Sequence, residues 1–429
     1  MRYNPINKDL FITNRQNLKK YLQPGSIAVF TSNDTMPTNA DGVMGFRQNN
    51  DLFYLSGVDQ EETILIIYPE SKNNSLQEIL FVRETNDHIK IWEGDKLTQA
   101  QAKEISGIET VYWTSQFESI LNNLIFEVNN IYLNFNEHTR ASKSFDSKEE
   151  RLIKWFKKHY PLHSFMRAAP IMHKIRAIKS PLEIEQIKTA ISITGKAFKR
   201  VLPLIKPGIM EYEIEAELTY DFIKNKSRGH AYAPIIASGS DACVLHYITN
   251  NKECKDGDLL LMDVGSEYGN YAADLTRCIP VNGRFSPRQK EVYQSVYNVL
   301  KNATELLTEG NTWKNYNDEV AKLMESELLS LKLLSKDEIL HQDKANPAYK
   351  KYFMHGASHY LGLDVHDVGS KYEPFQVGMV LTCEPGIYIR EEGLGIRLEN
   401  NILISEKGPI NLMKEIPLEP EEIEELMNR

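Results

Sequence analysis

Histidines gather in one short stretch of the sequence, F-M-H-G-A-S-H-Y-L-G-L-D-V-H-D, which runs from Phe353 to Asp367. Three of the eleven histidines, His355, His359 and His366, lie within it. Neutral imidazole is the most common metal ligand in proteins and a frequent acid or base near neutral pH, so this stretch indicates a site rather than a piece of core. Whether the histidines form a site depends on carboxylates elsewhere in the chain.

Four carboxylates stand at places where strands are expected to begin or end. Asp263 and Asp274 lie eleven residues apart around G-S-E-Y-G-N, a segment rich in turn formers, so a hairpin would bring them together. Two carboxylates in one site repel each other unless one is protonated or a cation lies between them. Glu384 follows an apolar run and precedes a Pro-Gly pair. Glu399 lies two residues after Arg397, so on a strand the guanidinium would share its face and could orient the carboxylate.

Oxygen ligands with at least one imidazole suit a pair of hard or borderline divalent ions. Mn²⁺ is the natural choice, and Zn²⁺, Co²⁺ and Fe²⁺ stay open. Two ions roughly 3.5 Å apart, bridged by carboxylates, would hold a hydroxide and clamp a tetrahedral intermediate, so the residues predict metal-assisted hydrolysis. A helical H-E-x-x-H zinc site is rejected, because Gly-Ala-Ser separates His355 from His359 and supplies no glutamate.

Each of these residues also has an ordinary structural interpretation. An aspartate beside a glycine is usually a turn residue, and a lone histidine usually has a structural hydrogen bond. His246, in L-H-Y-I-T-N, would be placed in that second group by its spacing alone. Only the occurrence of all these residues together favours a two-metal hydrolase.

The elements that must position these residues fall into two domains, because 429 residues exceed what one hydrophobic core usually supports. Residues 1–172 are predicted to be an α/β domain, with strands near Ser26, Glu62 and Glu78. Residues 173–429 are predicted to be α+β. Ser180-Pro181-Leu182-Glu183 begins a helix with a capping box. Two more helices are expected over 211–226 and 287–308.

The strands of the second domain come in pairs, in the segments D-L-L-L-M-D-V-G and Y-A-A-D-L-T-R-C-I-P-V, then M-V-L-T-C-E-P-G-I-Y-I and G-I-R-L-E-N-N-I-L-I-S. Within each pair the strands are too close in sequence for a parallel crossover, which favours antiparallel pairing. The prediction is a curved antiparallel sheet with helices to one side.

Composition narrows the classes of partner. The net charge is −9 and no long basic run offsets it, so nucleic acid is not expected as a partner. No segment has the apolar length of a signal peptide or a membrane span, so no membrane partner and a cytoplasmic location are expected. The four cysteines form no C-x-x-C pair, which is typical of a compartment where thiols stay reduced.

The ordered set of motifs resembles the aminopeptidase P branch of the creatinase/methionine-aminopeptidase superfamily. The motifs are H-Y in L-H-Y-I-T-N, D-V-G followed by A-D-L-T-R, H-G-A-S-H-Y-L-G-L-D-V-H-D-V-G, E-P-G-I-Y-I and G-I-R-L-E-N. The resemblance implies a pita-bread fold for the second domain. It also implies a creatinase-type N-terminal domain, most clearly at F-R-Q-N-N-D-L-F-Y-L-S-G-V from Phe46.

The resemblance also implies roles for individual residues. Two metal ions, usually Mn²⁺, would be bound by Asp263, Asp274, His359, Glu384 and Glu399. Within this set, Asp274 and Glu399 would bridge both ions.

The remaining candidates follow from the resemblance as residues that do not bind metal. Three histidines would position the substrate and stabilise the tetrahedral intermediate: His246, His355 and His366. Arg397 would support the site, Tyr232 and Tyr388 would line it, and Trp92 would reach the pocket of a neighbouring subunit. A homodimer or homotetramer is implied.

The implied reaction releases an N-terminal residue from peptides with proline in second position. A hydroxide bridging the two metals would attack the carbonyl before proline, with Glu384 taking and returning the proton. A prolidase, which accepts only Xaa-Pro dipeptides, uses the same ligands and is the alternative. A non-catalytic pita-bread binding protein is a more distant alternative. Such members generally lose metal ligands, whereas all five candidate ligands are present in this sequence.

The sequence departs from the family pattern in two places. Asn400 and Asn401 follow Glu399 where relatives more often carry acidic residues, which removes negative charge near the metals. The segment from Tyr388 to Gly395 is shorter than in many bacterial relatives, so one rim of the pocket is expected to differ.

Overall fold

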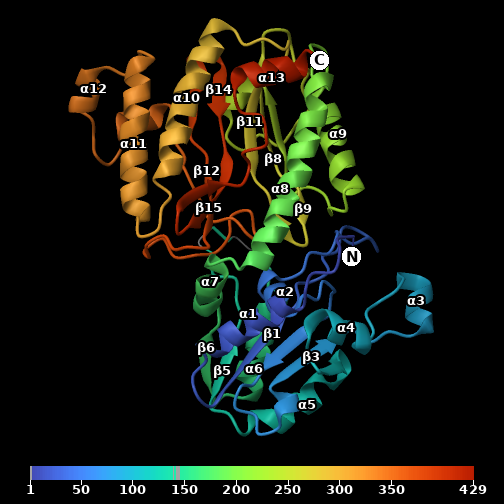
Figure 1. The fold of residues 1–429 in the computed structure, drawn as a ribbon. Helices are drawn as coiled ribbons and strands as arrows, with labels where there is room; N and C mark the ends of the chain where they lie inside the picture. Colours follow the sequence, from blue (N-terminus) through green and yellow to red (C-terminus); the bar gives the residue numbers. More distant parts are fainter. Residues whose placement is uncertain (1, 139, 142–144) are drawn as a thin grey trace. The chain divides into compact units, whose positions relative to one another are not determined.

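The chain forms two compact units in a computed structural model that describes residues 2–138, 140–141 and 145–429. The N-terminal unit comprises Pro5–Arg176, and the C-terminal unit comprises Ala177–Arg429 together with Arg2–Asn4 (Figure 1). The predicted fold classes, α/β followed by α+β, are confirmed.

The N-terminal unit is built on one six-stranded sheet with the order β4-β3-β2-β1-β5-β6. The pairs β1–β2 and β2–β3 are antiparallel, whereas β3–β4, β1–β5 and β5–β6 are parallel. The strands are β1 Ser26–Thr31, β2 Ile64–Ile67, β3 Glu78–Val82, β4 Thr110–Trp113, β5 Asn130–Leu133 and β6 Ser164–Arg167. The helices are α1 Asp9–Lys19, α2 Asn50–Ser56, α3 Asp87–Glu93, α4 Gln99–Ser106, α5 Phe117–Ile125, α6 Lys148–His159 and α7 Ala169–Ala177.

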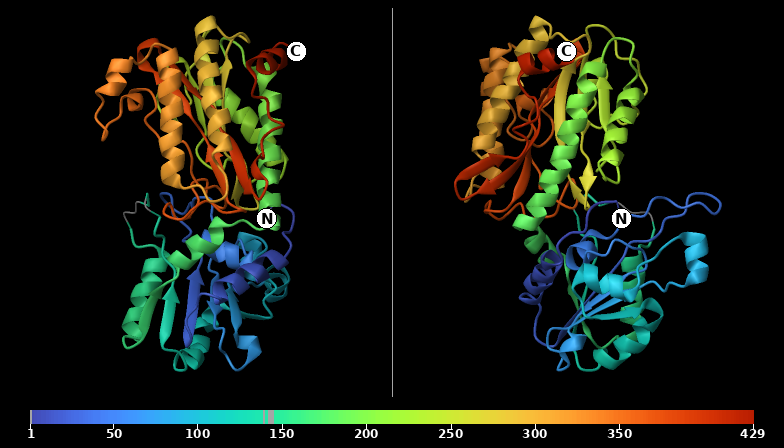
Figure 2. Two further views of the ribbon diagram at one scale, coloured as in Figure 1. Left: turned by 60° about the vertical axis from the view of Figure 1, so that its left-hand side comes forward. Right: turned by 45° about the vertical axis from the view of Figure 1, so that its right-hand side comes forward.

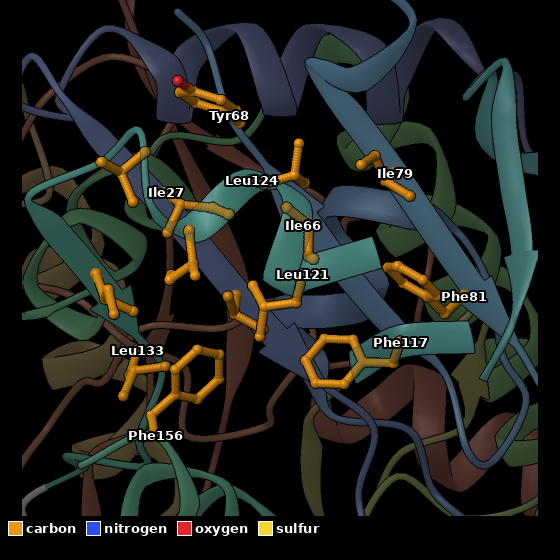
Figure 3. Close-up of a cluster of buried hydrophobic side chains, with 14 residues drawn as sticks. Ile27, Ile66, Tyr68, Ile79, Phe81, Phe117, Leu121, Leu124, Leu133 and Phe156 are labelled. Atoms are coloured by element: carbon orange, nitrogen blue, oxygen red, sulfur yellow. The ribbon is translucent and has the colours of Figure 1, made fainter. Parts of the chain in front are cut away.

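Alternate residues on the strands build the core of this unit. Ile79 and Phe81 of β3 lie two apart and so share one face of the sheet, where helix α5 packs on them (Figure 3). Phe117 of α5 meets Phe81 edge to face, with ring centroids 5.4 Å apart. Leu121 of α5 lies in the same cluster, one turn further along the helix. The apolar stripe of α5 thus fixes which face of the sheet it covers.

Three of the helices in the C-terminal unit were predicted and are confirmed with small shifts at their ends: α8 Pro181–Val201, α9 Glu211–Lys224 and α10 Pro287–Glu305. The capping box at α8 is present, because the Glu183 carboxylate accepts from the Ser180 N–H at 2.8 Å and the Ser180 hydroxyl accepts from Glu183 N–H. A further long helix, α11 Trp313–Ser330, was not predicted. The long helices α8, α10 and α11 run beside the strands of this unit (Figure 2). The shorter helices are α12 Lys336–Leu340 and α13 Pro420–Met427.

The strands of this unit pair antiparallel, as predicted. One sheet has the order β11-β8-β7 and another the order β12-β15-β16, with two-stranded pairs β13-β14 and β9-β10. Their bounds are β7 Ile235–Ser238, β8 Leu259–Val264, β9 Glu267–Tyr268, β10 Tyr271–Ala272, β11 Leu275–Pro280, β12 Val380–Cys383, β13 Gly386–Ile389, β14 Leu394–Arg397, β15 Asn400–Ser405 and β16 Gly408–Asn411. Short 3₁₀ turns link several of them, including η4 Gly239–Cys243 and η6 Arg390–Glu392.

A membrane-crossing helix is absent from the described residues, because none of their helices combines sufficient length with sufficient apolar character.

A buried carboxyl group joins three elements of the N-terminal unit. Glu149, in the first turn of α6, accepts a hydrogen bond from each of the side-chain amides of Asn49 and Asn134, both at 2.9 Å. Burial first, and then the charge of the nearby Asp51 carboxylate, raise the pKa of Glu149 to about 7. The folded state therefore favours the protonated form of Glu149.

Glu149→Gln is expected to stabilise the protein more at pH 8 than at pH 5. A folded-state pKa above the unfolded value means that wild-type stability is fully present below about pH 4.5 and falls as pH rises toward 7. A glutamine keeps the acceptor oxygen without the charge, so its advantage grows over that window to at most about 3 kcal/mol. Calorimetric melting temperatures at both pH values measure it. Glu104→Gln, at an exposed position of α4, is the control and should show no such pH dependence.

Candidate metal centre

Two of the predicted carboxylates meet at the β8–β11 hairpin. Asp263 lies near the end of β8, and Asp274 directly precedes β11. The Tyr232 hydroxyl lies 2.6 Å from an oxygen of each, so its single proton can be donated to either carboxylate. Burial, and then the charges of the two aspartates, raise the pKa of Tyr232 well above its usual value. Tyr232 therefore stays a neutral donor between two acidic groups.

The other predicted ligands come from segments more than 80 residues further along the chain. Glu384 follows β12, and Glu399 lies between β14 and β15. His359 is held beside β12, because its N–H donates to the Thr382 hydroxyl at 3.1 Å and its carbonyl accepts from the Thr382 N–H at 2.9 Å. The sheet thereby sets the position of the histidine.

The two ring nitrogens of His359 have different partners: Nδ1 faces a main-chain carbonyl, and Nε2 points toward the carboxylates. Nδ1 lies 2.9 Å from the Tyr360 carbonyl, which fixes the proton on Nδ1 when the ring is neutral. Nε2 lies 3.4 Å from Asp274 and 3.5 Å from Glu384. A neutral His359 therefore presents a lone pair to the acidic cluster, which is the form that binds metal.

Among the described residues, one group has the arrangement needed to hold a metal ion: Asp274, His359 and Glu399. One ligand atom from each lies within 4.8 Å of the others. Oε1 of Glu399 is buried and has no hydrogen-bond donor, whereas Oε2 accepts from the Thr276 hydroxyl at 2.7 Å. A buried carboxylate oxygen without a donor is costly unless a cation satisfies it, so the residues fit a metal ion.

The electrostatics of the cluster show the same excess of negative charge. Burial first, and repulsion from neighbouring carboxylates as well, raise the pKa of Asp274, Glu384 and Glu399, and the pKa of Glu384 reaches about 7. Burial alone would lower the pKa of His359, but hydrogen bonding to Asp274 and the charge of Glu384 raise it to about 9. A proton on His359 would therefore balance part of the negative charge of Asp274 and Glu384.

Arg397 joins the cluster to the candidate substrate side. Its guanidinium donates to Asp263 at 2.6 Å, to the Tyr388 hydroxyl at 2.8 Å and to the Thr276 hydroxyl at 3.3 Å. Because Thr276 in turn donates to Glu399, the route from Arg397 to Glu399 runs through Thr276. Sequence reasoning had not singled out Thr276, although it lies two residues after Asp274, the same spacing that relates Arg397 to Glu399.

The three remaining candidate histidines differ in environment. Nε2 of His355 lies 2.7 Å from the Tyr388 hydroxyl, and Nδ1 lies 2.8 Å from the Gly356 carbonyl. Burial first, then Arg397, lower the pKa of His355 to about 4, with a smaller contribution from His246. His355 is thus neutral and accepts from Tyr388, which itself accepts from Arg397.

His366 lies edge-on to His359, with ring centroids 4.4 Å apart and planes at 85°. His246 is exposed, just beyond η4, and lies close enough to His355 to influence its pKa. Trp92 lies on α3 of the N-terminal unit with 77% of its surface exposed.

Both halves of the chain match known protein families. Residues 185–406 match the family described as metallopeptidase family M24, and residues 11–132 match the aminopeptidase P N-terminal domain. The Xaa-Pro aminopeptidase of Escherichia coli is 35% identical, with 98% of each chain covered.

Solved structures agree over the whole length. A putative aminopeptidase P from Bacillus anthracis has a TM-score of 0.90 and 34% identity, covering 98% of each chain. Zn-substituted E. coli aminopeptidase P in complex with product has a TM-score of 0.88 and 33% identity, covering 99% of each chain.

The fold and the acidic cluster with its histidine define a metallopeptidase, and hence a hydrolase. The chain belongs to metallopeptidase family M24, in the aminopeptidase P branch that the sequence motifs predicted.

Arg397→Lys is expected to lower kcat/KM by roughly 10–100-fold. A lysine ammonium is a single point of charge and cannot reproduce the fork that reaches Asp263, Tyr388 and Thr276 together. Steady-state kinetics on a proline-containing peptide measure the effect. Arg390→Lys, an exposed change on η6, is the matched control. Equal activities for the two variants would show that the fork is not needed.

Proposed function

We propose that the protein releases the N-terminal residue from peptides whose second residue is proline. The observation that carries the proposal is the buried group of Asp274, His359 and Glu399, in which one oxygen of Glu399 lacks a donor. The specificity for proline is supported by relatives named Xaa-Pro aminopeptidase, which align with nearly the whole chain. A prolidase is not favoured by these relatives, and a non-catalytic role does not fit a chain that retains every candidate ligand.

The proposed divalent ions would be held by Asp263, Asp274, His359, Glu384 and Glu399, of which Asp274 and Glu399 would serve both ions. We propose Mn²⁺ as the native ion, since carboxylates outnumber imidazoles in the set. When bound, the ions supply Lewis acidity that activates water and polarises the carbonyl before proline. The buried group of Asp274, His359 and Glu399 supports a divalent cation at this site.

The residues of the chain would then divide the work of peptide hydrolysis. Glu384 lies 3.5 Å from His359 and 3.8 Å from His355, and in this proposal it takes a proton from the attacking water and returns it to the proline nitrogen. Burial and then the charge of Arg397 keep His355 neutral, and the hydrogen bond from Tyr388 orients its ring. His246 and His366 would hold the substrate and the negative charge that develops on the carbonyl oxygen.

A dedicated enzyme for such peptides has a physical reason. The Xaa-Pro bond is a tertiary amide that lacks an N–H and isomerises between cis and trans, so it fits poorly in sites built for extended peptides.

Four expectations stay predictions from the sequence: the homo-oligomeric state, the role of Trp92, the domain limits at 172/173 and the cytoplasmic location.

Peptide length is expected to separate the two proline-specific activities. The protein should cleave Xaa-Pro-Yaa-Zaa and release Xaa, whereas an Xaa-Pro dipeptide should be a poor substrate. Liquid chromatography of the products from both peptides, at equal concentration and with added Mn²⁺, measures this. A matched peptide with alanine in second position controls for general aminopeptidase activity. Cleavage confined to the dipeptide would identify a prolidase instead.

Glu384→Ala and His366→Ala are expected to differ in metal content. Glu384→Ala should lower kcat at least about 100-fold and impair metal binding, because it removes both a ligand and the proton carrier. His366→Ala should lower kcat by roughly 100-fold while two ions per chain are retained. Elemental analysis of protein purified without added metal, beside steady-state kinetics, distinguishes them. Loss of metal from the His366 variant would mean that the wrong histidine has been assigned as ligand.

A further inference from the structure

Asn401 is a fully buried polar side chain next to the metal cluster and is not itself a candidate ligand. It lies on β15 with 0% of its surface exposed. Its Nδ2 donates to the Asp274 carbonyl at 2.7 Å, and its Oδ1 accepts from the Asp274 N–H at 3.2 Å. Both halves of one side-chain amide are thus used on the main chain of one residue.

The main chain of Asn401 is fixed by other strands. It pairs with Thr382 in β12, and its carbonyl accepts from the Leu412 N–H at 2.9 Å. Thr382 is also the residue that holds His359 through two hydrogen bonds. Asn401 is therefore related to all three members of the cluster. It bonds to Asp274, it pairs with the residue that holds His359, and it lies two residues after Glu399.

In this chain, asparagine at 401 matches the polarity of both bonds. The Asp274 carbonyl is an acceptor, so its partner must donate, and an ionised aspartate has no proton to give. Asn400 is different, because its Oδ1 accepts from Arg277 at 2.8 Å. An aspartate at 400 would keep that bond and gain an ion pair. The two adjacent asparagines therefore have opposite hydrogen-bonding roles.

We propose that Asn401 is a positioning residue that fixes the main chain of Asp274, and so the separation of the Asp274 and Glu399 carboxylates, for metal binding. The inference rests on the proposed metal site. The sequence had indicated that the two asparagines act by removing negative charge. The hydrogen bonds show that the Asn401 side chain both donates to the Asp274 carbonyl and accepts from the Asp274 N–H. An aspartate at 401 would lack the donor.

The test compares Asn401→Asp with Asn400→Asp in the full-length protein, stripped of metal and titrated with Mn²⁺ by calorimetry. Both variants are isosteric and add one negative charge to neighbouring positions of one strand. Asn401→Asp should weaken Mn²⁺ binding roughly 10–100-fold, whereas Asn400→Asp should stay close to wild type. With saturating Mn²⁺, Asn401→Asp should lower kcat and leave KM nearly unchanged, because Asp274 is moved and the peptide contacts are not.

Several results would overturn the inference. Unchanged Mn²⁺ affinity in Asn401→Asp, or an equal change in both variants, would mean that charge rather than the donor matters. If Asn401→Asp does not fold, as judged by circular dichroism, Asn401→Ala removes the same bonds without a charge and should also bind Mn²⁺ more weakly. If neither folds, Asn401 serves the fold and the inference is wrong. Wild-type protein that binds no Mn²⁺ would instead remove the proposed metal site, and this inference with it.

Discussion

Repulsion among buried carboxylates is the constraint on which the C-terminal unit depends. Asp263, Asp274, Glu384 and Glu399 approach one another in surroundings that raise the pKa of the last three. Such a group is stable only if positive charge or protons compensate it. Arg397 provides part of that charge at Asp263, and a protonated His359 can provide part at Asp274 and Glu384. The remainder is the electrostatic reason for a metal ion.

The neutral groups around the cluster are as important as the charged ones. Tyr232, Thr276 and Asn401 each place a hydrogen-bond donor on the acidic residues or their main chain without adding charge. Neutral donors orient carboxylates while leaving their negative charge available to a cation. The site therefore combines one strong internal cation, Arg397, with several neutral hydrogen bonds, and this combination keeps the ligands both ordered and attractive to metal.

Much of this arrangement could be predicted from the sequence because it is locally encoded. The capping box at Ser180, the turn formers after Asp263 and the Pro-Gly pair after Glu384 each mark a helix start or strand end, and the structure has them. Helix α11 was missed although its signal was present: Thr312 caps it, and Trp313 and Tyr316 begin a buried stripe.

The contacts of Thr276, Arg277 and Asn401 could not be predicted, because they depend on β11 meeting the segment around β15 more than 120 residues away. No local pattern indicates which buried polar side chains will meet across such a distance. The family resemblance supplied the candidate ligands, but it did not supply the hydrogen bonds that hold them. The departure at Asn400 and Asn401 was visible in the sequence, and only the structure distinguishes the two residues.

The wide separation of the cluster along the chain has a consequence for biosynthesis. Asp274 and Glu399 are 125 residues apart, and His359 lies between them. In a ribosome-bound chain from which Glu399 has not yet emerged, the carboxylates are still far apart. High-affinity binding of a cation therefore follows completion of the C-terminal unit. Metal binding and native topology are therefore linked by mass action: the ion stabilises only the finished fold, and the metal available to the folded protein, rather than to the nascent chain, determines what the site contains.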